Sequence, residues 1–183
     1  MTNSKIKDMA IISVFTALTA VFSQISVPLP FTPVPINLAV LAVLLAGGLL
    51  GFKKAIASQA VYLLLGLVGV PVFAGFSGGL QKLVGPTGGY LIGYLFIAFF
   101  AGLIPYLKSD NFVKRATLMT LGIITCYALG TIWFMLSTGT GLIPSLGMCV
   151  IPFIPGDLFK LVVGVVFVER LSKVLGQLGF KAR

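Results

Sequence analysis

Two residues of opposite charge stand at the head of the last apolar segment of the chain. Asp157 and Lys160 lie three residues apart in "IPFIPGDLFKLVVGVVFVERL", a spacing that puts them on one face of a helix. Charged groups are costly where water is scarce. One hypothesis is that the carboxylate and the ammonium present an acceptor and a donor to a polar ligand. The alternative is structural: Asp157 caps the helix N-terminus, and Lys160 either reaches the membrane surface or pairs with Asp157.

Further candidates lie in the Pro- and Gly-rich region before the fourth apolar segment and at the start of that segment. Gln81 and Lys82 occur in "GFSGGLQKLVG", and Tyr90 occurs in "GPTGGYLIG". Lys82 is either simply solvated or, if this loop closes over a cavity, close to an anionic group of a ligand. The nearby Phe73 and Phe76 could then pack on the apolar part of that ligand.

Small residues recur at four-residue spacing in two helical segments. Gly85, Gly89 and Gly93 would share one helix face, which predicts close helix packing. The first segment contains two further pairs, Ser13 with Ala17 and Thr16 with Ala20. Those pairs allow close approach of another helix, either within the bundle or from a separate subunit.

The composition is that of a membrane protein. Hydrophobic residues make up 58% of the 183 residues and charged residues only 9%, against about half and about a quarter in soluble domains. The chain has no histidine and only four acidic residues, which leaves little for acid–base or metal chemistry. We therefore expect no enzyme, no cofactor and no metal site. A GxxxxGK(S/T) phosphate-binding loop is also missing, so the chain carries no recognisable ATPase of its own.

Proline, glycine and clusters of charge divide the chain into six apolar segments. A transmembrane helix needs about 20 mostly apolar residues, and we place the predicted helices at residues 8–27, 36–52, 54–70, 87–107, 113–137 and 156–178. The sequence thus predicts an all-α membrane protein, a bundle of six transmembrane helices that forms a single domain over residues 1–183. The outer connections are rich in Pro and Gly yet apolar, so we expect them to fold back over the bundle.

The basic residues predict the orientation in the lipid bilayer, because short cytoplasmic loops carry an excess of Lys and Arg. With the N-terminus inside, the cytoplasmic side collects eleven of the 13 basic residues: Lys5, Lys7, Lys53, Lys54, Lys108, Lys114, Arg115, Arg170, Lys173, Lys181 and Arg183. The outer connections hold only Lys82, and Lys160 lies within the last helix. This asymmetry favours both termini in the cytoplasm. Since the charges stand in short clusters between apolar runs, the net charge of +9 indicates topology and no nucleic-acid partner.

Three stretches together resemble the BioY family, the substrate-binding S components of energy-coupling-factor (ECF) vitamin transporters, here for biotin. They are "VPLPFTPVPINLAVLAVLLAGGLLG", "GLVGVPVFAGFSGGLQKLVGPTGGYLIGY" and "IPGDLFKLVVG", in the order of the family, and the resemblance covers nearly the whole chain. It implies a six-helix protein of the prokaryotic cell membrane whose outer loops help to enclose biotin. It also implies assembly with a transmembrane T subunit and two ATPase subunits.

The resemblance carries over to two groups of residues. The Asp and Lys at the head of the family's last helix match Asp157 and Lys160. The small residues of the first helix, Ser13, Ala17 and Ala20, resemble the family's surface for the T subunit.

The chemistry of biotin agrees with the candidate residues. Its ureido ring has two N–H donors and one carbonyl acceptor, which suit a carboxylate beside an ammonium. Its sulfur ring and alkyl chain require apolar walls, such as Phe31, Phe73 and Phe76, and its carboxylate requires a cation or donors near the mouth. The predicted substrate-binding residues are Asp157, Lys160, Tyr90, Gln81, Lys82 and Phe73. The competing hypothesis is a stand-alone carrier or channel that works by ion coupling or facilitated diffusion, in which Asp157 or Lys160 controls coupling or gating.

Overall fold

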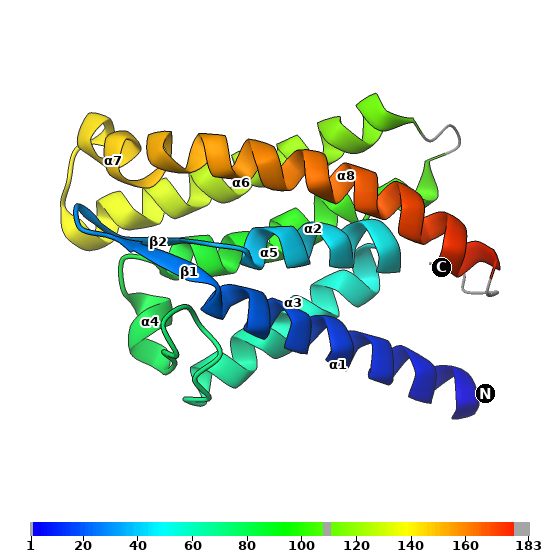
Figure 1. Cartoon of the computed structure of the whole chain (residues 1–183). Helices are drawn as coiled ribbons and strands as arrows, with labels where there is room; N and C mark the ends of the chain where they lie inside the picture. The colour runs from blue at the N-terminus through cyan, green and yellow to red at the C-terminus, as the bar shows by residue number, and fades with distance from the viewer. Residues whose placement is uncertain (1, 108–110, 178–183) are drawn as a thin grey trace.

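The computed structural model describes residues 2–107 and 111–177. Over these residues the structure is a helical bundle with one β-hairpin (Figure 1). The elements are α1 Thr2–Gln24, β1 Ser26–Leu29, β2 Thr32–Asn37, α2 Ala39–Leu50, α3 Phe52–Leu67, α4 Leu80–Val84, α5 Gly88–Ala101, η1 Ile104–Tyr106, α6 Phe112–Thr138, α7 Leu142–Cys149, η2 Ile151–Phe153 and α8 Ile154–Gln177. The predicted topology also used three basic residues that lie outside the described residues: Lys108, Lys181 and Arg183.

Each of the six predicted segments falls on one helix, namely α1, α2, α3, α5, α6 and α8. The ends differ most at α1, which begins at Thr2, and at α5, which ends at Ala101 and is followed by the 3₁₀ turn η1. Four helical stretches are long and apolar enough to cross a membrane: Lys5–Gln24, Gly88–Tyr106, Phe112–Thr138 and Leu142–Gln177. The chain is therefore a mostly helical membrane protein.

The prediction of an all-α fold is wrong at the first outer connection, which forms the hairpin of β1 and β2. The strands pair antiparallel, with Ser26 opposite Asn37 and Val27 opposite Ile36. The four prolines of "VPLPFTPVP" oppose a helix, because proline has no N–H and restricts the residue before it to extended conformations. Each strand of a two-stranded hairpin has one unpaired edge, where proline is tolerated.

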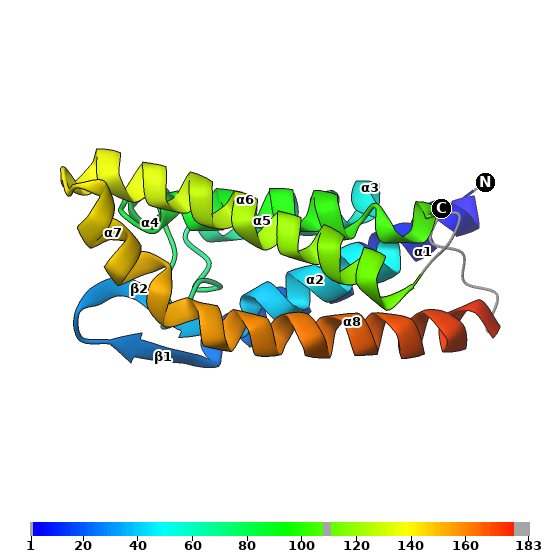
Figure 2. The same ribbon diagram turned by 90° about the horizontal axis from the view of Figure 1, so that it is seen from above.

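Helix α2 is the centre of the bundle and packs against α1, α3, α5 and α8 (Figures 1 and 2). Its Val43 and Leu44 have no exposed surface. Its 12 residues extend about 18 Å at 1.5 Å per residue, well short of a hydrocarbon core about 30 Å thick. Non-helical backbone is tolerated at membrane depth where protein surrounds it or where it lines a cavity. Because α2 is short and surrounded by other helices, the chain before it can form the hairpin instead of a longer helix.

A single residue, Gly51, joins α2 to α3. Its φ of 80° lies in the left-handed region that favours glycine, and the next N–H, of Phe52, donates to the Gly102 carbonyl at 3.0 Å. The sequence analysis placed this break at residue 53. Lys53 and Lys54 instead lie in the first turn of α3.

Glycines bring α5 and α6 close together, as the four-residue spacing predicted. A Cβ added at Gly89 would lie 2.3 Å from the Trp133 Cβ, and one at Gly93 would lie 2.5 Å from the Cys126 Sγ, so neither position has room for a side chain. The prediction is wrong for Gly85, which ends α4 and precedes α5.

The two ends of the bundle differ in character. The start of α1 and the end of α8 lie at one end, whereas the hairpin, α4 and α7 lie at the other (Figures 1 and 2). These three elements come from the three Pro- and Gly-rich connections that were expected to fold back over the bundle. They surround the cavity described next.

Candidate functional site

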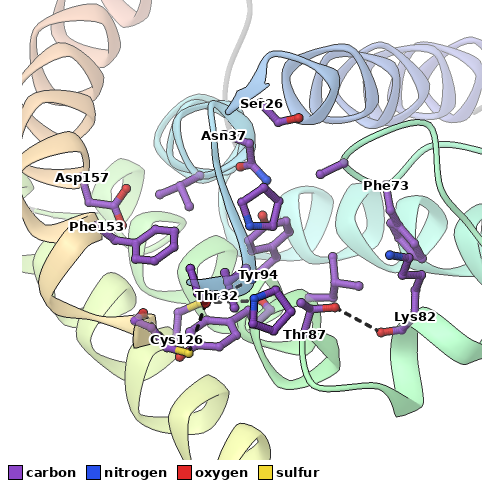
Figure 3. Close-up of a pocket in the computed structure, with 18 of the residues that line it drawn as sticks. Ser26, Thr32, Asn37, Phe73, Lys82, Thr87, Tyr94, Cys126, Phe153 and Asp157 are labelled. Carbon is purple, nitrogen blue, oxygen red and sulfur yellow. Dashed lines mark hydrogen bonds between the residues drawn. The ribbon is translucent and has the colours of Figure 1, made fainter. Parts of the chain in front are cut away.

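A cavity lies among the hairpin, α4, α7 and the adjoining ends of the longer helices (Figure 3). Its volume is about 480 Å³, within the range of about 300–1,000 Å³ that is usual for small-molecule sites. Its walls come from the hairpin, from the segment between α3 and α4, and from every described helix except α1 and the short turn η1. The site is therefore assembled from segments that are distant in the sequence.

Asp157 and Lys160 form a buried ion pair in the wall supplied by α8. Lys160 Nζ donates to Asp157 Oδ1 at 2.6 Å, and the two residues are only 4% and 6% exposed respectively. Desolvation makes such a pair a weak source of stability, while removal of one partner leaves a buried charge uncompensated. A charged pair beside a cavity is better explained by a ligand that needs it.

The structural alternative for these two residues is wrong about the helix cap and right about one of its two outcomes for Lys160. Helix α8 begins at Ile154, so Asp157 lies within the first turn and not at the cap. Lys160 is buried and pairs with Asp157, which is the second of the two outcomes that the alternative allowed for it. The positive end of the helix dipole still favours a carboxylate in this first turn.

Tyr127, which the sequence analysis did not single out, holds the other oxygen of the carboxylate. Its hydroxyl donates to Asp157 Oδ2 at 2.6 Å, from α6, and its side chain also lines the cavity. The carboxylate is thus fixed by a donor on its own helix and by one from a neighbouring helix. The sequence did offer one sign of this role, because the Tyr127 hydroxyl occurs in the middle of the apolar run "GIITCYALG".

The other two described carboxylates lie far from the cavity. Asp8 pairs with Lys54 at 2.8 Å, and Glu169 pairs with Arg115 at 2.8 Å and with Lys173 at 3.0 Å. Asp8 belongs to the first half of α1, and Glu169 and Lys173 belong to the second half of α8. The Asp8–Lys54 pair links α1 to α3 and the Glu169–Arg115 pair links α8 to α6, whereas the Glu169–Lys173 pair lies within α8. None of these residues lines the cavity.

Tyr90, one of the predicted substrate-binding residues, lies on α5 and lines the cavity. Its hydroxyl forms a hydrogen bond of 3.1 Å with the Thr131 hydroxyl and donates to the Cys149 carbonyl at 3.5 Å. The ring packs over Gly130, where an added Cβ would lie 2.3 Å from ring carbons. Tyr90 therefore connects α5, α6 and α7 at the cavity wall.

Phe73 supplies part of the aromatic wall from the segment between α3 and α4. It is 2% exposed, and its ring contacts Tyr62 edge-on, with centroids 5.4 Å apart. The ring sits where any side chain at Gly66 would be, because a Cβ built there would lie 1.9 Å from Phe73 Cζ. Gly66 thus makes the space that positions Phe73.

The two polar residues of α4 have different surroundings. Lys82 lines the cavity while remaining exposed, and it lies on the opposite side of the pocket from Asp157 (Figure 3). Gln81 is exposed and is not part of the lining. The end of α4 is tied to α6, because Trp133 Nε1 donates to the Gly85 carbonyl at 3.0 Å.

The two other phenylalanines that were expected as apolar walls lie elsewhere. Phe31, at the tip of the hairpin, is 53% exposed, and Phe76 is 74% exposed. Neither belongs to the cavity lining. Their place is taken by Tyr62, Tyr94 and Phe153, of which Phe153 stands close to the ion pair in the sequence.

The hairpin contributes polar groups that the sequence analysis did not include. Asn37 and Thr32 both line the cavity. Asn37 Oδ1 accepts a hydrogen bond from the Ala39 N–H at 3.1 Å, and Thr32 Oγ1 accepts one from the Val34 N–H at 3.2 Å. Local backbone contacts therefore fix both side chains at the cavity. In the sequence, Thr32 was hidden among prolines in the first outer connection, and Asn37 fell at the start of the predicted helix 36–52, which begins only at Ala39 in the structure.

The small residues of α1 point in two directions. Ser13 and Ala17 are exposed on the outer face, whereas Thr16 is buried and donates to the Ser58 carbonyl of α3 at 2.9 Å. Ala20 is partly buried and packs against the core. The pair Ser13 and Ala17 is therefore available to a separate subunit, and Thr16 with Ala20 serves the bundle.

Comparison with known families identifies the chain. The model of the family described as "BioY family" matches residues 1–177. The chain belongs to the BioY family. The resemblance drawn from its three sequence stretches is thereby confirmed.

Curated BioY proteins match over nearly their whole length. A probable biotin transporter BioY from Pyrococcus horikoshii is 40% identical over 172 residues, which cover 92% of this chain and 98% of that protein. The biotin transporter BioY from Thermotoga maritima is 42% identical over 162 residues, which cover 88% and 93%. Membership of this transporter family, with its apolar helices, makes the chain a membrane-embedded prokaryotic protein and not an enzyme.

A solved structure in the family has the same fold. The crystal structure of the S-component for biotin from an ECF-type ABC transporter matches this chain with a TM-score of 0.87 and 36% identity, covering 94% of each chain. This chain therefore shares its overall fold with that crystal structure.

Proposed function

We propose that this chain is the biotin-binding S subunit of an ECF-type transporter, which captures biotin outside the cell and delivers it inward with ATPase partners. The observation that carries the proposal is the buried Asp157–Lys160 pair in the wall of a cavity of about 480 Å³. Biotin has a compact ring with both donors and an acceptor, and enclosing such a rigid ligand with its polar groups satisfied gives high affinity.

The proposed orientation places the ureido ring of biotin at α8. Asp157 accepts the ureido N–H groups, and Lys160 donates to the ureido oxygen or holds Asp157 in place. The position of Lys82 on the opposite side of the pocket (Figure 3) supports a role in binding the biotin carboxylate. Phe73 and Tyr90 would border the apolar ring and chain. Gln81 could contact the ligand only if α4 moved so that this side chain faced the cavity.

We propose that residues 1–183 act as one transmembrane domain with six spans and both termini in the cytoplasm. Eleven basic residues on one side against Lys82 on the other favour this orientation. The start of α1 and the end of α8 at the same end of the bundle (Figure 1) agree with an even number of spans. Helices α2 and α3 are short for independent spans and would cross as part of the enclosed core.

The proposed partners are a transmembrane T subunit and two ATPase subunits. The chain lacks a phosphate-binding loop of its own, so transport against a gradient requires energy from elsewhere. The outward pair Ser13 and Ala17 offers a flat surface on which another helix can pack closely. Ala20 would contribute only at the margin of that surface, because it packs against the core.

The test is calorimetric titration of the purified chain in detergent with biotin, using thiamine and riboflavin as controls of different shape. We expect tight one-to-one binding of biotin alone. A folded, monodisperse sample that fails to bind biotin, or that binds all three vitamins alike, would contradict the proposal.

A further inference from the structure

The segment between α3 and α4 forms a tight loop over the cavity. Phe73 and Ser77 exchange backbone hydrogen bonds of 2.9 and 3.2 Å, which closes the loop around Gly75 and Phe76, both with positive φ. Within residues 72–77, Phe73, Ala74, Gly75 and Ser77 line the cavity. The loop therefore forms part of the cavity wall.

The last turn of α1 holds this loop through side chains. Gln24 Nε2 donates to the carbonyls of Val72 and Phe73, both at 3.1 Å, and Gln24 Oε1 accepts the Phe76 N–H at 2.8 Å. Ser23 Oγ adds a bond of 2.6 Å to the Val72 carbonyl. A single amide thus satisfies backbone groups on both sides of the turn, although α1 itself contributes nothing to the cavity lining.

The same turn of α1 also fixes the hairpin. The strand β1 begins two residues after Gln24, and the Leu38 N–H, which follows β2, donates to the carbonyls of Phe22 and Ile25, both at 3.3 Å. The hairpin and the 72–77 loop are both non-helical parts of the cavity wall. Both are therefore attached to the C-terminal end of α1.

We infer that Gln24 is a positioning residue for ligand capture: it holds the 72–77 loop in place over the cavity. This inference rests on the proposed function for the identity of the ligand. The hydrogen-bond partners that the described residues give Gln24 are backbone groups and the Ser23 hydroxyl, none of them charged. A change at Gln24 therefore acts through the loop and not through the ion pair.

The first experiment measures the dissociation of radiolabelled biotin from the purified chain and its Gln24→Ala and Gln24→Glu variants. Gln177→Ala and Gln177→Glu, at the exposed end of α8, are the matched controls. Changes within one site act mostly on dissociation, so we expect both Gln24 variants to release biotin roughly tenfold faster at neutral pH, with a similar Tm for the ligand-free protein.

The Gln24→Glu variant distinguishes a positioning role from general destabilisation. Its carboxylate keeps an acceptor for Phe76 but loses the donors to Val72 and Phe73. When the pH falls to or below the ordinary glutamate pKa of about 4.3, the carboxyl group becomes protonated and an O–H donor is restored. We expect its dissociation rate, divided by that of the wild type at the same pH, to fall as the pH is lowered, whereas the ratio for Gln24→Ala stays high.

Hydrogen–deuterium exchange of residues 72–77 in the ligand-free protein gives a readout that needs no ligand. Faster exchange there in Gln24→Ala, with no change in the α5 and α6 helices, supports the inference. Exchange and dissociation rates equal to those of the Gln177 controls at every pH would overturn it. Wild-type protein that fails to bind biotin while the exchange result holds would count against the proposed function and leave the role of Gln24 in positioning the loop supported.

Discussion

The Tyr127 hydroxyl donates to Asp157 Oδ2 at 2.6 Å across the interface of α6 and α8. Asp157 Oδ1 already accepts from Lys160, so both carboxylate oxygens are oriented before any ligand enters. A carboxylate oxygen can accept more than one hydrogen bond. The oriented carboxylate therefore keeps the capacity to accept ligand N–H groups, and binding does not have to order it.

Tyr127→Phe should weaken biotin binding without unfolding the protein. The variant removes one buried hydrogen bond to a charged group, worth about 1.5 kcal/mol or somewhat more, which corresponds to an affinity loss of roughly tenfold or more. Calorimetric titration measures the loss. Tyr106→Phe, at a half-exposed position outside the cavity, is the control, and equal affinities for the two variants would refute the role of Tyr127.

Asp157→Asn should weaken biotin binding by about 1–3 kcal/mol, the range for buried polar groups left mismatched. It should also lower the Tm, because it leaves the Lys160 ammonium buried without its counter-charge. The double variant Asp157→Asn with Lys160→Met removes that stranded charge. We expect the double variant to regain thermal stability but not affinity; wild-type affinity in a folded Asp157→Asn protein would exclude a ligand role for the carboxylate.

Gly66→Ala should disturb the aromatic wall. The new methyl group would overlap the Phe73 ring, 1.9 Å from Cζ, and overpacking of this kind costs about 1–3 kcal/mol. Because Phe73 borders the cavity, we expect weaker biotin binding together with a lower Tm. Gly176→Ala has no neighbour within 4 Å and serves as the control. Unchanged binding in Gly66→Ala would show that Phe73 is not needed in its present position.

Lys82→Gln should have a small and selective effect. Lys82 is exposed, and pairs between exposed charges contribute about 1 kcal/mol or less, so we expect affinity for biotin to fall at most about fivefold. The loss should vanish for biotin methyl ester, which has no carboxylate, and should shrink at high salt. Lys53→Gln is the matched control. An equal loss for biotin and its ester would remove Lys82 from carboxylate binding.

Reconstitution separates the proposed subunit from the stand-alone carrier or channel. In liposomes with an imposed pH gradient, we expect the purified chain alone to bind biotin without accumulating it. Accumulation that follows the gradient, with no ATPase present, would favour ion coupling at Asp157 or Lys160 and would contradict the proposed need for partner subunits.

The sequence predicted the features that depend on local patterns. Apolar runs located α1, α2, α3, α5, α6 and α8, and the spacing of Asp157 and Lys160 placed them on one face, since both arguments need only the geometry of one helix. Tyr127 was missed because its partner lies 30 residues away on another helix. Contacts of this kind follow from how α6 packs against α8, which composition and spacing do not determine.

The mouth of the cavity was less predictable for a different reason. The five-residue helix α4 has too few residues for a periodic pattern, so its rotation could not be deduced, and only Lys82 of the neighbours Gln81 and Lys82 lines the cavity. The hairpin was hidden because proline excludes a helix without specifying what replaces it. Pairing with a second strand and packing of β2 against α1 and α7 decide the fold there.

The bond from Trp133 to the Gly85 carbonyl gives the protein an intrinsic optical probe. Trp133 is the sole tryptophan of the chain, and its indole N–H is bound to the residue that ends α4, the helix that carries Lys82. If α4 shifts when biotin enters, the polarity around the indole changes and the emission spectrum moves with it. Stopped-flow fluorescence of the unlabelled protein can therefore time the response of the mouth to the ligand.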